Sequence, residues 1–115
     1  MPKQTFIGAF EGVSDNATTF DLEGDKLPRS MVRCFQRIVT GNQNGKSQKA
    51  KIGLKNGTTI VWLYGAAVTY NDQPVCFGGT VWATGDWVPF VRMAGAGVGD
   101  HIYLYTYGYV ADVVS

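Results

Sequence analysis

Residues 47–64 read SQKAKIGLKNGTTIVWLY, and this stretch decides the fold. Its first half alternates lysines with apolar residues, which is the two-residue period of a β-strand with one buried face. Asn56-Gly57 follows at once. Because both residues tolerate positive φ, this dipeptide between apolar runs is the strongest short signal of a β-hairpin. We therefore predict that a basic strand over 47–55 pairs with an antiparallel strand over 58–64.

The rest of the chain is punctuated in the same way. Almost every apolar segment is short, rich in β-branched or aromatic residues, and closed by Gly, Asn, Asp or Pro, as strands and turns are. No segment has a convincing helical pattern, which excludes a parallel α/β sheet because its crossovers need helices. Further strands are expected over 5–10, 18–22, 30–40, 66–70, 75–77, 80–83, 86–93, 101–107 and 109–114.

Length and composition agree with one all-β domain. The chain has 115 residues, of which 45% are hydrophobic, 13% aromatic and only 17% charged. A second core would have too little chain, and a disordered chain would lack these aromatic residues. Turns that recur about every eight to twelve residues are typical of sandwiches and barrels, so we predict a single domain over 1–115, an antiparallel jelly-roll-like β-sandwich of about seven to nine strands.

Neither the amino terminus nor the cysteines indicate secretion or metal chemistry. The amino terminus has no apolar stretch of signal-peptide length, and no window approaches the roughly 18 apolar residues of a membrane span, so we expect a chain that is cytosolic at synthesis. Cys34 and Cys76 lie outside any C-x-x-C or Cys/His cluster, which disfavours zinc and dithiol redox chemistry. Buried free thiols are preferred, with a disulfide as the alternative. No cofactor or metal is expected.

The segment 30–40 gives the clearest strand. Its alternation places Arg33, Phe35 and Arg37 on one face, which we expect to be the outer one. Arg33 and Arg37 would then project side by side with Phe35 between them, either as a contact surface or as solvated arginines. The core face would consist of the alternate residues Val32, Cys34, Gln36 and Ile38.

Charge is segregated along the chain, although the net charge is only +1. Residues 26–55 hold eight Lys or Arg and no acid, whereas residues 1–25 hold five acids and a single lysine. These blocks suit either docking on an acidic partner surface or ordinary cross-strand ion pairs. A third hypothesis is the binding of single-stranded nucleic acid, with Phe35 and Trp62 as stacking platforms.

Two Gly-Asp pairs, at 85–86 and 99–100, each precede a ring residue and a β-branched residue. Glycine supplies unusual backbone angles and aspartate accepts hydrogen bonds from nearby amides, so we assign both aspartates to turns rather than to catalysis. Pro89 follows the first pair and cannot donate a ladder hydrogen bond. It predicts that its strand lies at a sheet edge or at a bulge.

The sequence holds no catalytic signature. His101 is the one histidine, and on a strand its neighbour Asp100 would point to the opposite face. The loop 95–99 is rich in glycine but has neither a following helix nor a lysine to hold a phosphate. We therefore expect no enzyme.

Tyrosines alternate along the last predicted strand. Ile102, Leu104 and Thr106 form the opposite face, which we expect to be the core if the strand stays regular through Gly108. The tyrosine side suits a subunit interface first, because aromatic side chains give large contact area at low entropic cost, with a core face and a sugar-stacking platform as alternatives. The tyrosines are Tyr103, Tyr105, Tyr107 and Tyr109.

The order of these motifs resembles that of a known group of proteins. A basic strand and the hairpin at 56–59 lead into apolar residues 60–63 and a loop with Pro74. The strand start Gly-Asp-Trp-Val at 85–88 and a tyrosine-rich strand ending at 108–110 follow. This order is similar to that of small jelly-roll-like virion proteins of tailed bacteriophages, over about residues 33–114. The segments 8–28 and 95–99 match no part of that pattern.

The resemblance implies a non-enzymatic virion structural protein, either a capsid decoration (cement) protein that stabilises the shell from outside or a tail component. It implies the major capsid protein lattice as the partner. The tyrosine side and the charge blocks favour a homo-oligomer, and neither a membrane nor nucleic acid is an expected partner. The resemblance places the protein on the capsid surface after synthesis in the host cytoplasm. The alternatives are a carbohydrate-binding, lectin-like or tail receptor-binding module that uses Trp87, and a β-barrel for single-stranded nucleic acid. The candidate interaction surface comprises Arg33, Phe35, Arg37, Lys49, Lys51, Trp87, Tyr103, Tyr105, Tyr107 and Tyr109.

Overall fold

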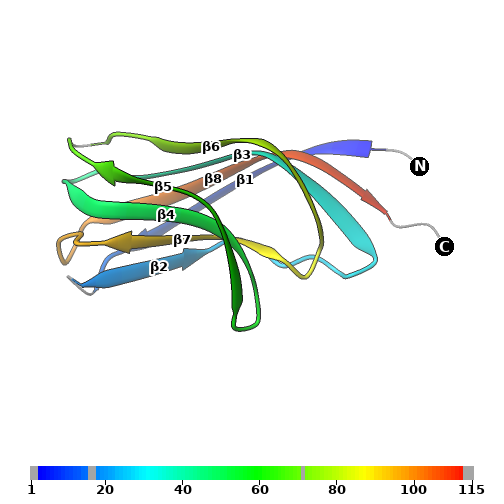
Figure 1. Cartoon of the computed structure of the whole chain (residues 1–115), viewed down its shortest axis with the longest axis horizontal. Helices are drawn as coiled ribbons and strands as arrows, with labels where there is room; N and C mark the ends of the chain where they lie inside the picture. The colour runs from blue at the N-terminus through cyan, green and yellow to red at the C-terminus, as the bar shows by residue number, and fades with distance from the viewer. Residues whose placement is uncertain (1–2, 16–17, 71, 113–115) are drawn as a thin grey trace.

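The computed structural model describes residues 3–15, 18–70 and 72–112. Within these ranges the chain forms eight β-strands and no helix (Figure 1). The strands are β1 (Lys3–Val13), β2 (Thr19–Glu23), β3 (Met31–Asn42), β4 (Ser47–Asn56), β5 (Thr59–Val68), β6 (Val75–Thr84), β7 (Val88–Ala94) and β8 (His101–Asp112).

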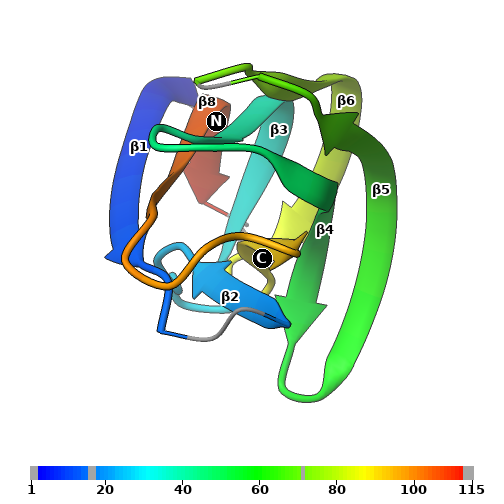
Figure 2. The ribbon, with the colours of Figure 1, turned by 90° about the vertical axis from the view of Figure 1, so that its left-hand side faces the viewer.

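The strands form two antiparallel four-stranded sheets, in the orders β1-β8-β3-β6 and β2-β7-β4-β5. Seen along the long axis of the molecule, the sheets face each other, and β5 lies beside β6 on one side (Figure 2). Eight antiparallel strands that alternate between two sheets in this way make a jelly roll. The predicted antiparallel jelly-roll-like β-sandwich is confirmed.

The core draws apolar side chains from both sheets. Ile52 of β4 and Leu104 of β8 are each fully buried, with 0% of the side-chain surface exposed. The rings of Phe6 and Phe35 meet edge to face, with centroids 5.7 Å apart, which is a favoured aromatic geometry. Thr106 is buried as well, so the non-tyrosine face of β8 points into the core as expected.

Strand β3 departs from the predicted alternation. Its register with both β6 and β8 shifts between Phe35 and Arg37. Against β8, Gln36 is the extra residue of a β-bulge, whereas against β6 two residues, 79 and 80, lie opposite it. Before the bulge, Arg33 and Phe35 are 1% and 0% exposed. After it, Ile38 is 0% exposed. The predicted faces are therefore wrong before the bulge, and Arg33 and Arg37 lie on opposite faces instead of side by side.

Strand β7 is internal, between β2 and β4. Pro89 is opposite Leu54 of β4, and the ladder with β2 ends one residue away, at the pair Glu23 and Phe90. The carbonyl of Pro89 accepts a hydrogen bond from the Gly24 amide at 2.8 Å. Pro89, which lacks an N–H, therefore lies just beyond the end of β2, where no ladder hydrogen bond from it is needed. The prediction of an edge strand or a bulge is wrong.

Three pairs of predicted strands are single strands. β5, β6 and β8 each run through glycines that the sequence pattern marked as breaks. At Gly108 in β8 a side chain would not fit, because an added Cβ would lie 1.8 Å from the carbonyl oxygen of Cys34. Glycine at this position permits close approach of two strands instead of a turn.

Candidate interaction surface

The aspartates of both Gly-Asp pairs accept hydrogen bonds that stabilise loops. Asp86 accepts from the side chains of Thr84 and Asn56. The Thr84 hydroxyl is the chief reason that the pKa of Asp86 lies below its usual range. Asp100 accepts a hydrogen bond from Asn42 Nδ2 at 2.8 Å. These contacts fit the expected role in turns.

The described residues offer no centre for metal binding. Among these residues, no three His, Cys, Asp or Glu side chains lie close enough together to hold a metal ion. Cys34 and Cys76 are free thiols, the first buried and the second half-buried. The described residues form no helix that could cross a membrane.

The residues of the predicted interaction surface lie in separate places. Arg33 and Phe35 are buried, and Trp87 is half-buried against the core. The outer face of the β2-β7-β4-β5 sheet takes Lys49 and Lys51, because the residues between them point into the core. The opposite outer face takes the four tyrosines and the arginine after the bulge. These residues therefore form two outer faces, not one continuous surface.

Arg33 fastens two loops from inside the core. Its Nη1 donates to Asp25 Oδ1 at 2.9 Å, and its Nη2 donates to the carbonyl oxygens of Asp25 at 2.9 Å and of Trp87 at 2.8 Å. The guanidinium lies 5.0 Å from the centroid of the Phe35 ring. Burial lowers the pKa of Arg33, and the Asp25 carboxylate opposes that shift. This arginine makes internal contacts and offers no outer surface.

We define the tyrosine face as the outer surface of the β1-β8-β3-β6 sheet. Strand β8 is regular through Gly108, so its four tyrosines share this face. Tyr103 and Tyr105 stack with ring centroids 4.8 Å apart. Tyr103 is only 6% exposed, and burial raises its pKa. The face consists of Thr5, Ile7, Ala9, Glu11, Arg37, Val39, Tyr103, Tyr105, Tyr107, Tyr109 and, at the β6 border, Trp82.

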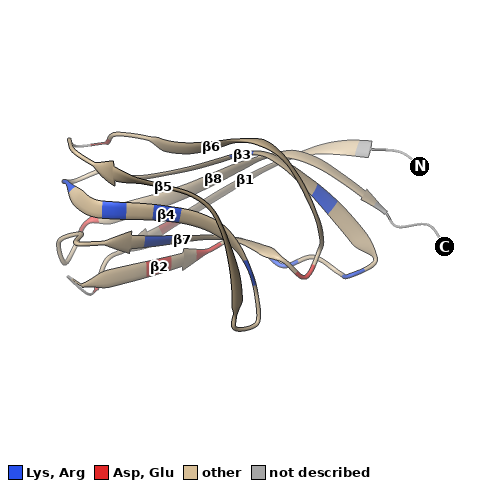
Figure 3. Cartoon of the chain, viewed as in Figure 1, with Lys and Arg blue, Asp and Glu red and all other residues tan. Residues whose placement is uncertain are grey.

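The tyrosine face exposes large apolar groups beside few charges. Ile7 is 76% exposed, Trp82 51% and Tyr107 38%. Among the side chains of this face that the structure describes, Glu11 and Arg37 are the charged ones. Lysines gather instead on β4, beside the arginine of β7, while the strands of the β1-β8-β3-β6 sheet are mostly uncharged (Figure 3). Exposed aromatic surface of this kind is typical of protein contact sites.

The opposite outer face, on the β2-β7-β4-β5 sheet, carries cross-strand ion pairs. Arg92 donates two hydrogen bonds to the Asp21 carboxylate, at 2.9 and 3.1 Å. That hydrogen bonding raises the pKa of Arg92. Lys55 pairs with Glu23. The acidic amino-terminal block therefore meets basic strands as ion pairs, which is one of the two arrangements that the charge pattern suggested.

We call the outer face of the β2-β7-β4-β5 sheet, with Lys49, Lys51, Lys55 and Arg92, the charged face. Its cations also lie close to aromatic rings. The Trp62 ring centroid lies 5.1 Å from Lys51 Nζ and 5.5 Å from Arg92 Cζ. Phe90 is 0% exposed, with its ring centroid 5.8 Å from that of Trp62. These are favourable cation–π distances. Trp62 is 37% exposed, but Phe35 is buried. The two residues expected to stack on nucleic-acid bases therefore form no shared platform.

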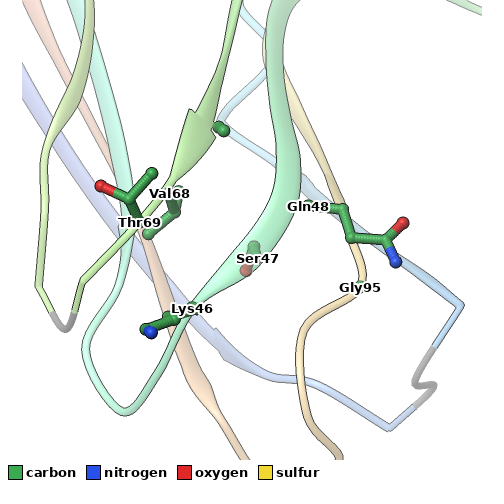
Figure 4. A pocket seen from close by; sticks show the side chains of 7 residues that line it. Lys46, Ser47, Gln48, Val68, Thr69 and Gly95 are labelled. Carbon is green, nitrogen blue, oxygen red and sulfur yellow. The ribbon is translucent and has the colours of Figure 1, made fainter.

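A shallow pocket of about 400 Å³ lies where the ends of β4 and β5 approach the loop after β7 (Figure 4). Lys46 is its charged side chain, and Gln48 points away from Lys46. The pocket brings together none of the predicted site residues. Its lining residues are Lys46, Ser47, Gln48, Ala67, Val68, Thr69 and Gly95.

Comparisons with known proteins identify a fold. No family model matches the chain, and no curated protein matches its sequence. The structure is similar to that of a protein of the Bacillus endospore appendages, which form disulfide-linked pili. That similarity has a TM-score of 0.54 at 10% sequence identity, over 97% of this chain and 89% of that chain. It supports the β-sandwich fold, and at such low identity it assigns no function.

Two further similarities are weaker. A protein of infectious bursal disease virus, strain Gx, aligns with a TM-score of 0.42 and 9% identity, over 95% of this chain and 31% of the viral chain. The family 29 carbohydrate binding module CBM29-2 aligns with a TM-score of 0.38 and 14% identity, over 86% of this chain and 65% of that chain. Neither carries an argument about what this protein binds.

Proposed function

We propose that this chain is a non-enzymatic structural protein of a phage virion, a capsid decoration protein whose tyrosine face contacts the outer surface of the capsid lattice. The observation that carries the proposal is the exposure of Ile7, Tyr107 and Trp82 on one face of one sheet. Exposed apolar patches on soluble proteins mark interaction sites, and aromatic side chains give large contact area at low entropic cost. The resemblance to small phage virion proteins supplies the kind of partner.

The charged face is less suited to docking on an acidic lattice. Arg92 and Lys55 already bind the carboxylates of Asp21 and Glu23. An acidic partner would have to displace these carboxylates. It could bind Lys49 and Lys51 on the same face directly, but exposed ion pairs contribute little free energy. The tyrosine face needs no such exchange, because a partner gains apolar contact there by displacing water alone.

The proposed mechanism is adhesive. Most of the tyrosine face lies on β1 and β8, whose pairing has no register shift. Its side chains are therefore held in place before binding and lose little conformational freedom on contact. A homo-oligomer that places several such faces on one lattice would bind with an avidity well above that of a single copy. Many modest contacts would then stabilise the shell.

The test is binding to capsids. A gene for a major capsid protein beside the gene for this chain would supply the partner, and capsids assembled from that protein are the probe. We expect the purified chain to co-sediment with these capsids. Tyr107→Asp should reduce binding at least about tenfold, because it places a charge in the centre of an apolar contact.

Tyr70→Asp is the matched control. Tyr70 is 58% exposed and lies outside the tyrosine face, so this variant should bind capsids as the unaltered chain does. The proposal is wrong if the unaltered chain does not bind capsids, or if both variants lose binding equally.

A further inference from the structure

Two adjacent edge strands carry no charged residue. β5 reads TIVWLYGAAV and β6 reads VCFGGTVWAT, and each is the last strand of its sheet. The edge strands on the other side differ, since β1 contains Glu11 and β2 contains Asp21 and Glu23. Natural proteins usually protect exposed edges with charged residues or proline, because free backbone groups there can pair with another chain. Neither device is present in β5 or β6.

An apolar groove separates the two strands. It has a volume of about 400 Å³ and is lined mainly by Leu54, Val61, Leu63, Val81 and Trp87. Val61 is 48% exposed. β5 and β6 lie on the same side of the sandwich (Figure 2), and their free edges flank this apolar groove. We call β5, β6 and this groove the uncharged side.

The regular parts of both strands border this groove. The register of β5 with β4 is continuous over residues 59–62 and shifts beyond them. The register of β6 with β3 is continuous over residues 81–84 and shifts before them. Bulges disrupt a strand's capacity to pair. The segments 59–62 and 81–84 are thus regular stretches able to add a partner strand, and Val61 and Val81 within them also line the groove. β6 is regular over residues 75–78 as well, but these residues do not line the groove.

We propose that a second copy of this chain covers the uncharged side across a two-fold axis. Such an axis places the same surface of both copies in contact and makes paired strands antiparallel. Any charged side chain near the axis would then lie close to the same side chain of the other copy, and the two like charges would repel each other. β5 and β6 have no charge to oppose, whereas β2 would set Asp21 and Glu23 against their own copies. The contact would satisfy free backbone groups and remove Val61 from water.

The test is sedimentation velocity of the isolated chain across a wide range of concentration, and it does not involve capsids. We expect a dimer of about twice the 12.5 kDa chain mass. Val61→Lys and Thr59→Lys should each weaken the dimer at least about tenfold, because each places like charges against each other across the axis. Thr59 is exposed, so its variant keeps the proposal testable if Val61→Lys fails to fold.

Val98→Lys is the matched control. Val98 is 69% exposed in the loop before β8, and its variant should dimerise normally. A strict monomer at the highest concentration would overturn the proposal. So would a series of growing species, which indicates a head-to-tail contact, or a dimer that Ile7→Lys abolishes while Val61→Lys and Thr59→Lys leave it intact.

Discussion

Arg33 donates a hydrogen bond to the carboxylate of Asp25 at 2.9 Å, from a side chain that is only 1% exposed. The same guanidinium binds the carbonyl oxygens of Asp25 and Trp87. One cation thus joins the loop after β2 to the loop after β6. The Asp25 side chain is 52% exposed, so a buried charge depends on a counter-ion near the surface.

Loss of that counter-ion should be costly. We expect Asp25→Ala to lower the free energy of unfolding by about 2 kcal/mol, less than for a fully buried pair because Asp25 is half exposed. In an Arg33→Met background the same change should cost less than about 0.5 kcal/mol, since no buried charge is left unpaired. Urea unfolding of the two single variants and the double variant measures this coupling. If the changes in the free energy of unfolding are additive in the double variant, the pair of Arg33 and Asp25 contributes no coupling energy to stability.

The bulge at Gln36 predicts which deletions β3 tolerates. Deleting Gln36 makes the pairing of β3 with β8 regular and keeps Phe35 and Ile38 facing the core. On the other side, β6 then has two extra residues, 79 and 80, so this variant should fold at a cost of about 0.5–3 kcal/mol. Deleting Val39 turns Thr40 and the residues beyond it to the wrong face, and that variant should not fold. Circular dichroism and urea unfolding distinguish the two. The bulge assignment fails if both deletions are tolerated or both are not.

The sequence predicted features that depend on local pattern. The hairpin after the basic strand and the separation of tyrosines from core residues on β8 follow from neighbouring residues alone, and both are present. The turn is shifted by one residue from the prediction, because Asn56 pairs with Thr59 and the turn residues are Gly57 and Thr58. The burial of Arg33 does not, because its acceptors are 8 and 54 residues away. The bulge in β3 depends on how β6 and β8, which are distant in the sequence, pair with β3 on its two sides. The split of the candidate surface into two faces follows from that bulge and from the sheet order.

Gly108 should be the least replaceable glycine in a strand. An alanine Cβ there would lie 1.8 Å from the Cys34 carbonyl oxygen, and backbone atoms cannot move aside as a flexible side chain can. We expect Gly108→Ala to lower the free energy of unfolding by at least about 1–3 kcal/mol. Gly78→Ala is the matched control, because its Cβ would meet nothing closer than Arg37 Nη1 at 3.7 Å. Thermal unfolding should show little change for the control, and similar losses in both variants would contradict the steric argument.

Asp86 makes the turn before β7 sensitive to acid. The Thr84 hydroxyl, helped by Asn56 and Arg29, holds the pKa of Asp86 below its usual range. Because the folded pKa lies below the unfolded value of about 4, ionised Asp86 stabilises the fold fully above that pH, and this contribution is lost as the pH falls through the folded pKa. As the pH is lowered from about 5 to about 2, we expect the urea midpoint of Asp86→Asn to decrease less than that of the unaltered chain. Asp15→Asn, at an exposed site, should leave that decrease unchanged, and equal slopes for the two variants would contradict the assignment.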